Sequence, residues 1–270
     1  MIEISSVNKV FNPGSFNEVC ALEDVSLKIG KSEFVVIIGT NGSGKSTLLN
    51  IISGSVLPDS GEIIMNGSNV TDIPDFKRAS FISRVFQNPL AGTVSDMSIA
   101  ENLLIAWSRG KPKYPVIKLS KSLKNYFSER LKSLEMNLEN RIDSIMGVLS
   151  GGQRQAITLL MAVINPPAVL LLDEHTAALD PKTDFQVSKL TKNFIEQDKL
   201  TAVMITHSMQ KAVELKKRTI MLHKGKIIDD IPEEEMKFMT SDTLLEKFSD
   251  IRKKEKLTAD LIEELRKEYF

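Results

Sequence analysis

Hydrophobic and polar positions divide this chain into strands and helices. Residues 2–7 and 25–29 alternate apolar and polar side chains, a period of two that is typical of half-buried strands. Residues 34–38 and 169–172 are apolar throughout, which is typical of strands buried on both faces of a parallel sheet. Because helical segments separate these runs, we expect an α/β fold with an antiparallel ribbon at its start.

Turn signals place further strands along the chain. Asn66-Gly67 is a strong hairpin signal after a strand at 62–65, which itself follows a turn at 58–61, and Lys224-Gly225 closes a second hairpin. The other strands that we expect are 82–86, 202–206, 218–223 and 226–229. The chain therefore carries enough strands for a central sheet and a smaller ribbon.

Capping signals mark the beginnings of helices. Ser98 and Glu101 have the spacing of a capping box, and Asp180-Pro181 combines an N-cap with proline at the first helical position. Further helices are expected at 48–52, around 126–134, at 155–164, and in two C-terminal segments joined by a link at 253–256. Leu103, Leu104 and Trp107 give the helix after Ser98 an apolar face that either packs internally or contacts a partner.

The segment between the first buried strand and its helix has the pattern of a phosphate-binding loop. Residues 39–47 match G-x-x-x-x-G-K-[ST] at every fixed position. Glycines let backbone N–H groups point at phosphate oxygens, and the helix N-terminus adds positive potential. The alternative, a turn without a ligand, is disfavoured because strand, loop and helix agree. The nucleotide contacts expected here are Gly39, Asn41, Gly42, Ser43, Gly44, Lys45, Ser46 and Thr47.

Polar residues follow two of the buried strands. Asp173 and Glu174 end the apolar run at 169–172, and the carboxyl end of a parallel strand is where ligands bind in α/β sheets. Paired carboxylates at that place favour metal and water chemistry over solvated charge. His207 follows the strand at 202–206; a lone histidine is more often structural, but the same location favours a functional role.

Ser150-Gly151-Gly152 opens the helix at 155–164 and is a second candidate anion-binding end. Taken alone this signal is weak, because Gly-Gly before a helix is often only a tight turn. Phe11 and Phe16 flank the turn at Pro13-Gly14, where an aromatic ring packs into the core or stacks on a base.

Composition limits the kinds of partner. The 270 residues hold 35 basic and 35 acidic side chains, so the net charge of zero gives no electrostatic case for nucleic acid. Cys20 is the single cysteine, which excludes an internal disulfide and suits a reducing compartment. The apolar runs are too short to span a bilayer, so we expect a cytoplasmic chain. A basic loop, with Arg109, Lys111 and Lys113, is expected to be solvated, a partner or lipid contact being the alternative.

Five motifs stand in one order: residues 39–47, Gln87, Leu149-Ser150-Gly151-Gly152-Gln153, residues 170–174 and His207. Together they resemble the ATPase subunits of ABC transporters over about residues 2–230. The resemblance implies an α/β P-loop NTPase (RecA-like) core with an N-terminal antiparallel β subdomain and an inserted α-helical subdomain at about 88–150. Residues 231–270 are then a C-terminal helical extension.

The same resemblance assigns ATP and Mg²⁺ as cofactors. It implies that Lys45 reaches the β- and γ-phosphates, that Glu174 is the general base and that His207 contacts the γ-phosphate. Mg²⁺ is then surrounded by Ser46, Gln87 and Asp173, with Gln87 also counted among the catalytic residues. Phe11 matches the aromatic that stacks on adenine, and the extra turn residues after it leave Phe16 as a rival.

In this family the signature residues serve the nucleotide of the opposite subunit. The resemblance therefore implies an ATP-dependent head-to-tail homodimer, in which two ATPs lie between subunits. The residues that reach across are Ser150, Gly151, Gly152, Gln153 and Asp180. His175 stands where many importers carry proline, and we expect it to have no catalytic role.

Single-domain subunits of this size resemble importer ATPases, which pair with integral membrane permease subunits and serve a substrate-binding protein indirectly. The strings at 11–14, 84–93 and 173–183 resemble a subgroup encoded beside a binding lipoprotein and a permease, some members of which are associated with aromatic amino acids. A peripheral place on the cytoplasmic face of the membrane follows. The alternatives are a soluble ABC ATPase in DNA repair or translation, and an ATP-gated dimerisation switch without hydrolysis. One phosphate loop, no heptad array and the presence of Glu174 disfavour both.

Overall fold

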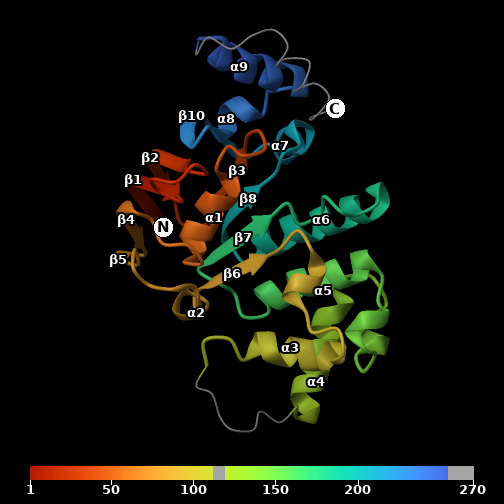
Figure 1. Cartoon of the computed structure of the whole chain (residues 1–270). Coiled ribbons are helices and arrows are strands. Elements are labelled where there is room, and N and C mark those ends of the chain that lie inside the picture. Colours follow the sequence, from red (N-terminus) through yellow and green to blue (C-terminus); the bar gives the residue numbers. More distant parts are fainter. Residues whose placement is uncertain (112–118, 255–270) are drawn as a thin grey trace. The chain divides into compact units, whose positions relative to one another are not determined.

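The computed structural model describes residues 1–111 and 119–254 (Figure 1). The chain divides into two units. The first unit is Met1–Pro74 with Val203–Phe270, and the second is Asp75–Ala202. None of the described helices combines the length and the apolarity that crossing a membrane requires.

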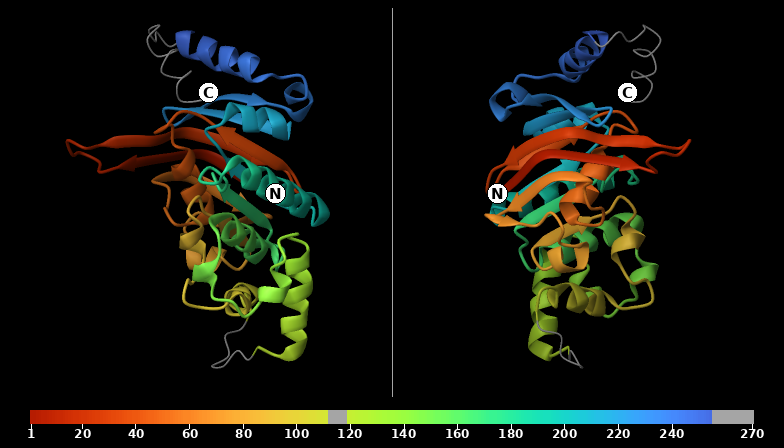
Figure 2. Two further views of the ribbon diagram at one scale, coloured as in Figure 1. Left: turned by 90° about the vertical axis from the view of Figure 1, so that its right-hand side faces the viewer. Right: turned by 60° about the vertical axis from the view of Figure 1, so that its left-hand side comes forward.

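An antiparallel sheet forms the start of the first unit. β1 (Ile2–Phe11) pairs with β2 (Val19–Ile29) on one side and with β4 (Ser60–Met65) on the other, and β5 (Ser68–Asn69) completes the order β2-β1-β4-β5. The expected antiparallel ribbon is confirmed, and Figure 2 shows how far β1 and β2 continue together toward their turn.

Two boundaries in this sheet differ from the predicted ones. The β1–β2 ribbon is longer than the alternating residues alone indicated, because pairing continues to Phe11 and Val19. β4 begins at Ser60, inside the predicted turn at 58–61. Gly61 permits this pairing, since it has φ +94° and a Cβ there would lie 2.5 Å from the Ser6 carbonyl oxygen.

Parallel strands carry the motifs of the first unit. β3 (Phe34–Ile38) pairs in parallel with β9 (Arg218–His223), and β9 forms the expected hairpin with β10 (Lys226–Ile231). β8 (Thr201–Ile205), which begins in the second unit, lies on the other side of β3. All five residues of β3 are buried, as the unbroken apolar run predicted. Helix α1 (Lys45–Ser53) follows β3 and buries four aliphatic residues, Leu48, Leu49, Ile51 and Ile52.

The C-terminal part of the first unit is helical. It contains α7 (Met209–Leu215), α8 (Glu233–Met236) and α9 (Ser241–Lys254). Leu244 and Phe248 of α9 are fully buried, and the Phe248 ring meets His223 edge-on at 6.1 Å. The predicted link at 253–256 began too early, because α9 continues to Lys254. The rest of that link and the predicted second helix lie outside the described residues, as does Lys113.

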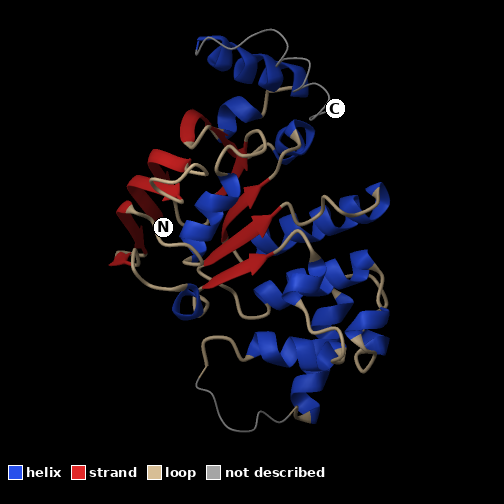
Figure 3. Ribbon diagram, in the orientation of Figure 1, coloured by secondary structure: helices blue, strands red, loops and turns tan. Residues whose placement is uncertain are grey.

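The described part of the second unit contains two parallel strands and four longer helices. β6 (Ile82–Val85) runs parallel to β7 (Val169–Asp173), with Ile82 opposite Val169 and Val85 opposite Leu172 (Figure 3). The helices are α3 (Ile99–Trp107), α4 (Lys121–Lys132), α5 (Gly151–Val163) and α6 (Pro181–Gln197), with a short α2 (Asp75–Arg78) and 3₁₀ turns at Pro89–Gly92, Glu139–Arg141 and Met146–Val148.

Caps account for where these helices begin. The predicted capping box at Ser98 and Glu101 is confirmed, and Asp180 caps α6 with Pro181 in the first position. α5 starts four residues before the predicted position because Ser150 also caps it. The expectation of a solvated side chain is wrong for Arg109 of the basic loop. Its guanidinium donates to the Ala162 and Asn165 carbonyls at the end of α5, and burial lowers its pKa.

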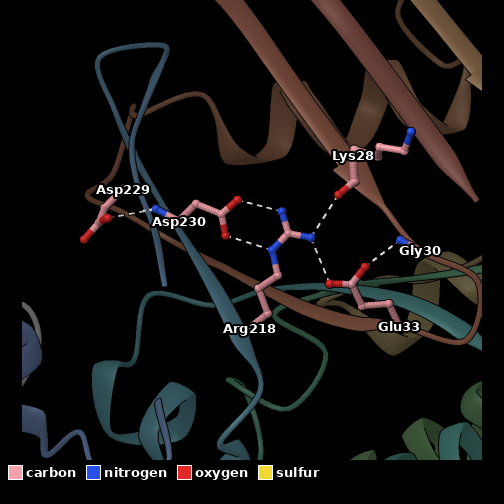
Figure 4. Close-up of polar contacts among 6 residues, drawn as sticks. All are labelled: Lys28, Gly30, Glu33, Arg218, Asp229 and Asp230. Atoms are coloured by element: carbon pink, nitrogen blue, oxygen red, sulfur yellow. Dashed lines mark hydrogen bonds and ion pairs between the residues drawn. The ribbon is translucent and has the colours of Figure 1, made fainter. Parts of the chain in front are cut away.

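Arg218, at the start of β9, joins three segments of the first unit (Figure 4). Its guanidinium donates to both Asp230 carboxylate oxygens at 2.8 and 2.6 Å, to Glu33 Oε1 at 2.8 Å and to the Lys28 carbonyl at 2.9 Å. The hydrogen bonds with Asp230, and then with Glu33, raise the pKa of Arg218. Paired donors of this kind give the stronger class of ion pair.

We expect Arg218→Met to lower the free energy of unfolding by about 1–3 kcal/mol, because four acceptor oxygens then lose a charged donor. Urea unfolding followed by circular dichroism measures the change. Lys28→Met is the matched control, since its more exposed ammonium pairs only with Glu3 among the interactions seen in the described chain. That variant is expected to change stability by less than about 1 kcal/mol. Equal effects of the two variants would contradict the role given to Arg218.

Candidate functional site

The predicted phosphate loop connects β3 to α1 and packs closely on its neighbours. Two of its glycines leave no room for a side chain: a Cβ at Gly39 would lie 2.1 Å from the Leu222 carbonyl oxygen, and one at Gly44 would lie 2.4 Å from that of Ala21. Gly44 also has φ +102° and immediately precedes α1. The glycines of the motif are therefore needed for close packing as well as for backbone conformation.

Two side chains of this loop suit an anionic ligand. Lys45 is buried, and its ammonium donates to the carbonyl oxygens of Gly39 at 2.6 Å and Thr40 at 3.0 Å. Ser43 Oγ is also buried and has no hydrogen-bond partner within the described part of the chain. A buried hydroxyl without a partner is unfavourable, and a phosphate oxygen would supply one. The loop therefore fits a polyphosphate.

The turn of the β9–β10 hairpin is hydrogen-bonded to the phosphate loop. Gly225 at its turn donates from its backbone to the Ser43 carbonyl at 3.0 Å, and its own carbonyl accepts from Glu23 in β2 at 2.9 Å. His207 lies at the same edge of the first unit, because Thr206 donates to Ile37 near the end of β3. The structure thus brings the phosphate loop and His207 to neighbouring strand ends. Ser46 and Asn41 are exposed.

Neither aromatic residue proposed for adenine belongs to the core. Phe11, at the end of β1, is 36% exposed, and Phe16, in the turn, is fully exposed. The core interpretation of these rings is therefore wrong. Lys9 Nζ lies 5.6 Å from the centre of the Phe11 ring, and this ring is less exposed than that of Phe16.

The carboxylates lie at the end of β7 in the second unit. Asp173 is the last residue of the strand, and Glu174 follows it with φ +43°, in the left-handed region. β6 ends beside β7 and leads through Phe86 to Gln87, so the loops that carry Gln87 and Glu174 leave the sheet at one edge. The position of the two carboxylates at the end of a buried strand agrees with the prediction from the apolar run at 169–172.

Arg84 is a neighbour of this edge that the motifs did not reveal. Its guanidinium donates to Asp173 Oδ2 at 2.5 Å and lies 4.8 Å from the centre of the Phe86 ring. Both side chains of the ion pair are largely buried, 14% and 17% exposed. Arg84 thereby fixes the Asp173 carboxylate beside the loop of Gln87.

The predicted metal ligands have the chemistry of a magnesium site. Asp173 offers a carboxylate, Gln87 an amide oxygen and Ser46 a hydroxyl, all hard oxygen donors of the kind that Mg²⁺ takes. Asp173 and Gln87 belong to the second unit, whereas Ser46 belongs to the first. The donor set therefore fits Mg²⁺ rather than a softer metal, which would require sulfur or imidazole.

The signature residues form a capped helix end in the second unit. Ser150 Oγ accepts from the Gln153 backbone at 3.3 Å, and Gln153 Oε1 accepts from the Ser150 backbone at 3.2 Å. The Ser-x-x-Gln spacing is a capping-box signal that was readable in the sequence. Ser150 and Gly151 remain exposed, so this end of α5 presents a surface to a ligand or a partner.

Gly152 joins that surface to Asp180. A Cβ at Gly152 would lie 2.0 Å from Thr183 Cγ2, so α5 and the first turn of α6 are in direct contact. Thr183 donates from its backbone to Asp180 Oδ1 at 3.2 Å, and its hydrogen bonds lower the pKa of Asp180. The exposed residues Ser150 and Gly151 at the start of α5 and Asp180 at the start of α6 thus belong to two helix ends that are in contact.

Comparison with known proteins places these motifs in context. Residues 22–177 match the family described as ABC transporter. The tyrosine transport ATP-binding protein of Clostridioides difficile (strain R20291) is 41% identical over 252 residues, which is 92% of this chain and 98% of that protein. The spermidine/putrescine import ATP-binding protein PotA of Haemophilus influenzae (strain ATCC 51907 / DSM 11121 / KW20 / Rd) is 35% identical over 230 residues, which is 85% of this chain and 57% of PotA.

Solved structures of ATP-binding cassettes are also similar to this chain. The ATP-binding cassette MJ0796, in a dimeric post-hydrolysis state with ADP and Pi, matches with a TM-score of 0.71 and 32% identity over 85% of this chain and 97% of that one. MJ1267, an ATP-binding cassette of an ABC transporter, matches with a TM-score of 0.76 and 25% identity over 93% of this chain and 98% of that one.

Proposed function

Because this chain belongs to the ABC transporter family of ATP-hydrolysing subunits, with its α/β P-loop fold, we propose that it powers import of a small solute as a head-to-tail dimer. The placement of Asp173 and Glu174 at the end of β7, beside the strand that leads to Gln87, carries the proposal. Both named relatives come from transport systems, and the MJ0796 cassette is dimeric. Steady-state ATP hydrolysis by the purified chain is the first test.

Each side chain then has a chemical task. Lys45 and the loop N–H groups bind the phosphates, Glu174 orients water and accepts its proton, and His207 contacts the γ-phosphate. Ser46, Gln87 and Asp173 would hold Mg²⁺, which neutralises charge on the β- and γ-phosphates when bound. Phe11 is the first choice for stacking on adenine and Phe16 the second.

The signature surface supports the dimer. Ser150, Gly151 and Asp180 are exposed on the second unit, whereas the phosphate loop belongs to the first. We assign residues 1–230 to the ATPase domain, with the helical insertion at about 88–150 and the extension at 231–270. Hydrolysis would then depend on closure of two subunits, and closure is what moves a permease.

An amino acid is the substrate class that we propose. The relative named for tyrosine transport is matched over nearly all of its length, whereas PotA is matched over little more than half. In cells that express this chain, Glu174→Gln should reduce uptake of labelled tyrosine and leave spermidine uptake unchanged. Loss of spermidine uptake alone would favour a polyamine system instead.

The surface proposed for the permease lies in the second unit. Segments 94–98 and 145–147 pair there through backbone hydrogen bonds. The buried Asn102 side chain accepts a hydrogen bond from the Val94 backbone N–H and donates one to the Val94 carbonyl. The exposed apolar residues of these and adjoining segments, here called the apolar patch, are Leu90, Val94, Met97, Ile145 and Val148. Of the two alternatives left open for the helix after Ser98, internal packing holds for Leu103, which is fully buried.

We expect single cysteines at Leu90, Ala91 and Thr93, in a Cys20→Ser background, to crosslink to the permease. The apolar anchors of the patch suit a helix of the membrane subunit. Crosslinking yield should differ between nucleotide-free and ATP-bound states. Phe238, 88% exposed in the first unit, supplies the control position. Crosslinking at Phe238 without crosslinking in the patch would place the docking surface elsewhere.

A further inference from the structure

Gln155 connects the two loops that carry Gln87 and Glu174. It lies in the second turn of α5 and is fully buried. Its amide Nε2 donates to the Phe86 carbonyl at 3.2 Å and to the His175 carbonyl at 2.5 Å. Phe86 immediately precedes Gln87, and His175 immediately follows Glu174. One amide group therefore holds both loops at a fixed separation.

We propose that Gln155 is a positioning residue for ATP hydrolysis: it sets the place of Glu174 relative to the loop of Gln87 and to the signature helix. The inference rests on the proposed function, in which Glu174 is the base. α5 begins with the cap at Ser150 and Gln153, so the same helix carries the signature and the amide that holds the base. A displacement of the signature end of α5 or of the Gln87 loop would therefore change the position of Glu174.

The backbone at Glu174 requires such support. Its φ of +43° is unfavourable for a residue with a side chain, and conformations of this kind persist only where the surroundings impose them. The Glu174 carbonyl accepts from Ala177 at 3.0 Å, and the next carbonyl, that of His175, accepts from Gln155. The left-handed turn is therefore held at two successive peptide groups.

His175 adds a second attachment. Its ring Nε2 lies 2.8 Å from Thr191 Oγ1 on α6, and both side chains are buried. The backbone of the residue after the base is thus held by α5, while its ring is held by α6. This supports a positioning role for His175, in keeping with the expectation that it has no catalytic one.

The two carbonyl oxygens that face Gln155 Nε2 require a hydrogen-bond donor at this position. Both groups that it faces are carbonyl oxygens, whereas Gln155 Oε1 is buried and has no hydrogen-bond partner among the residues that the structure describes. No solvent reaches the fully buried amide to replace a lost donor. A methionine keeps the length of the side chain and removes both N–H groups, so it tests the hydrogen bonds alone.

Gln155→Met should lower kcat at saturating Mg-ATP by about 10- to 100-fold, the effect expected of a small misplacement of a catalytic group. ATP affinity should change little, because the phosphate loop is untouched. Ser83→Ala is the matched control: Ser83 Oγ also links β6 to α5, through the Ala162 carbonyl at 2.7 Å, but does not hold the residue after Glu174. Its kcat should stay near that of the wild type.

A double variant separates positioning from general loss of structure. In a Glu174→Gln background, Gln155→Met should lower the residual rate no further, because both changes act through the same base. Multiplicative losses, or a wild-type kcat for Gln155→Met, would overturn the inference. If Glu174→Gln itself hydrolyses ATP normally, the proposed function fails instead.

Thr191→Val is a second variant with which the inference can be tested if Gln155→Met does not fold. It removes the hydroxyl beside His175 Nε2 and preserves the shape of the side chain. We expect about a 10-fold lower kcat with unchanged ATP affinity, since the second attachment of the turn is lost. A wild-type kcat in this folded variant would equally overturn the inference.

Discussion

Glu174→Gln is expected to lose nearly all ATP turnover while still binding ATP, so that an ATP-bound dimer accumulates. Removing a positioned base typically costs about 10²- to 10⁴-fold in rate. Glutamine keeps the size of the side chain at the end of β7 and does not alter the phosphate loop, which lies in a different segment of the chain. Steady-state hydrolysis measures the loss, and size-exclusion chromatography with ATP detects the dimer.

Glu196→Gln is the matched control for that change. Glu196 lies on α6 in the same unit, is 54% exposed, and only approaches Lys192, at 3.9 Å. The same chemical substitution there should leave both turnover and the monomer–dimer balance unchanged. A wild-type rate in Glu174→Gln, or an equal loss in the control, would remove Glu174 from the role of base.

The architecture could be predicted because it depends on local patterns. The unbroken apolar runs of β3 and β7 indicated buried parallel strands, and both are buried in the structure. The caps at Ser98 and Asp180 are set by residues three positions apart, so short-range spacing was sufficient to find them. The family comparison agrees with the fold inferred from these elements.

The supporting contacts of the site could not be predicted in this way. Arg84 and Asp173 are 89 positions apart, and Gln155 is 69 positions from Phe86. No periodicity in the sequence relates residues at such separations, because the folded sheet brings them together. Gln155 carried no local signal of its own, because Gln153 and Arg154 before it in the helix are also polar, and its two acceptors are backbone atoms that the sequence does not identify.

The hydrophobic pattern of the sequence also did not determine which apolar side chains are exposed. Phe11 ends β1 and Phe16 lies in the turn that follows, and both rings lie outside the core. Leu103 shows the opposite outcome, since it is fully buried while Leu90 in the preceding loop is 53% exposed. Hydrophobicity alone therefore did not separate core residues from candidate contact residues.

Lys45→Ala and Ser150→Arg should each abolish turnover, but for different reasons. Loss of the Lys45 ammonium should weaken ATP binding by about 10- to 100-fold, the usual effect of losing a charged hydrogen bond. Ser150→Arg should leave ATP binding by the monomer intact, because Ser150 lies in the second unit and the phosphate loop in the first. Ser150→Ala is its control, since that change removes the helix cap at a cost of about 1 kcal/mol without adding bulk.

A mixture of the two inactive variants tests whether each active site combines two subunits. In a head-to-tail heterodimer, one site joins the intact phosphate loop of the Ser150→Arg chain to the intact signature of the Lys45→Ala chain. Random pairing would restore about a quarter of the wild-type sites. If each chain instead used its own signature, every site in the mixture would carry a defect. Hydrolysis that reappears on mixing therefore supports composite sites, and its absence, with heterodimers confirmed by crosslinking, counts against them.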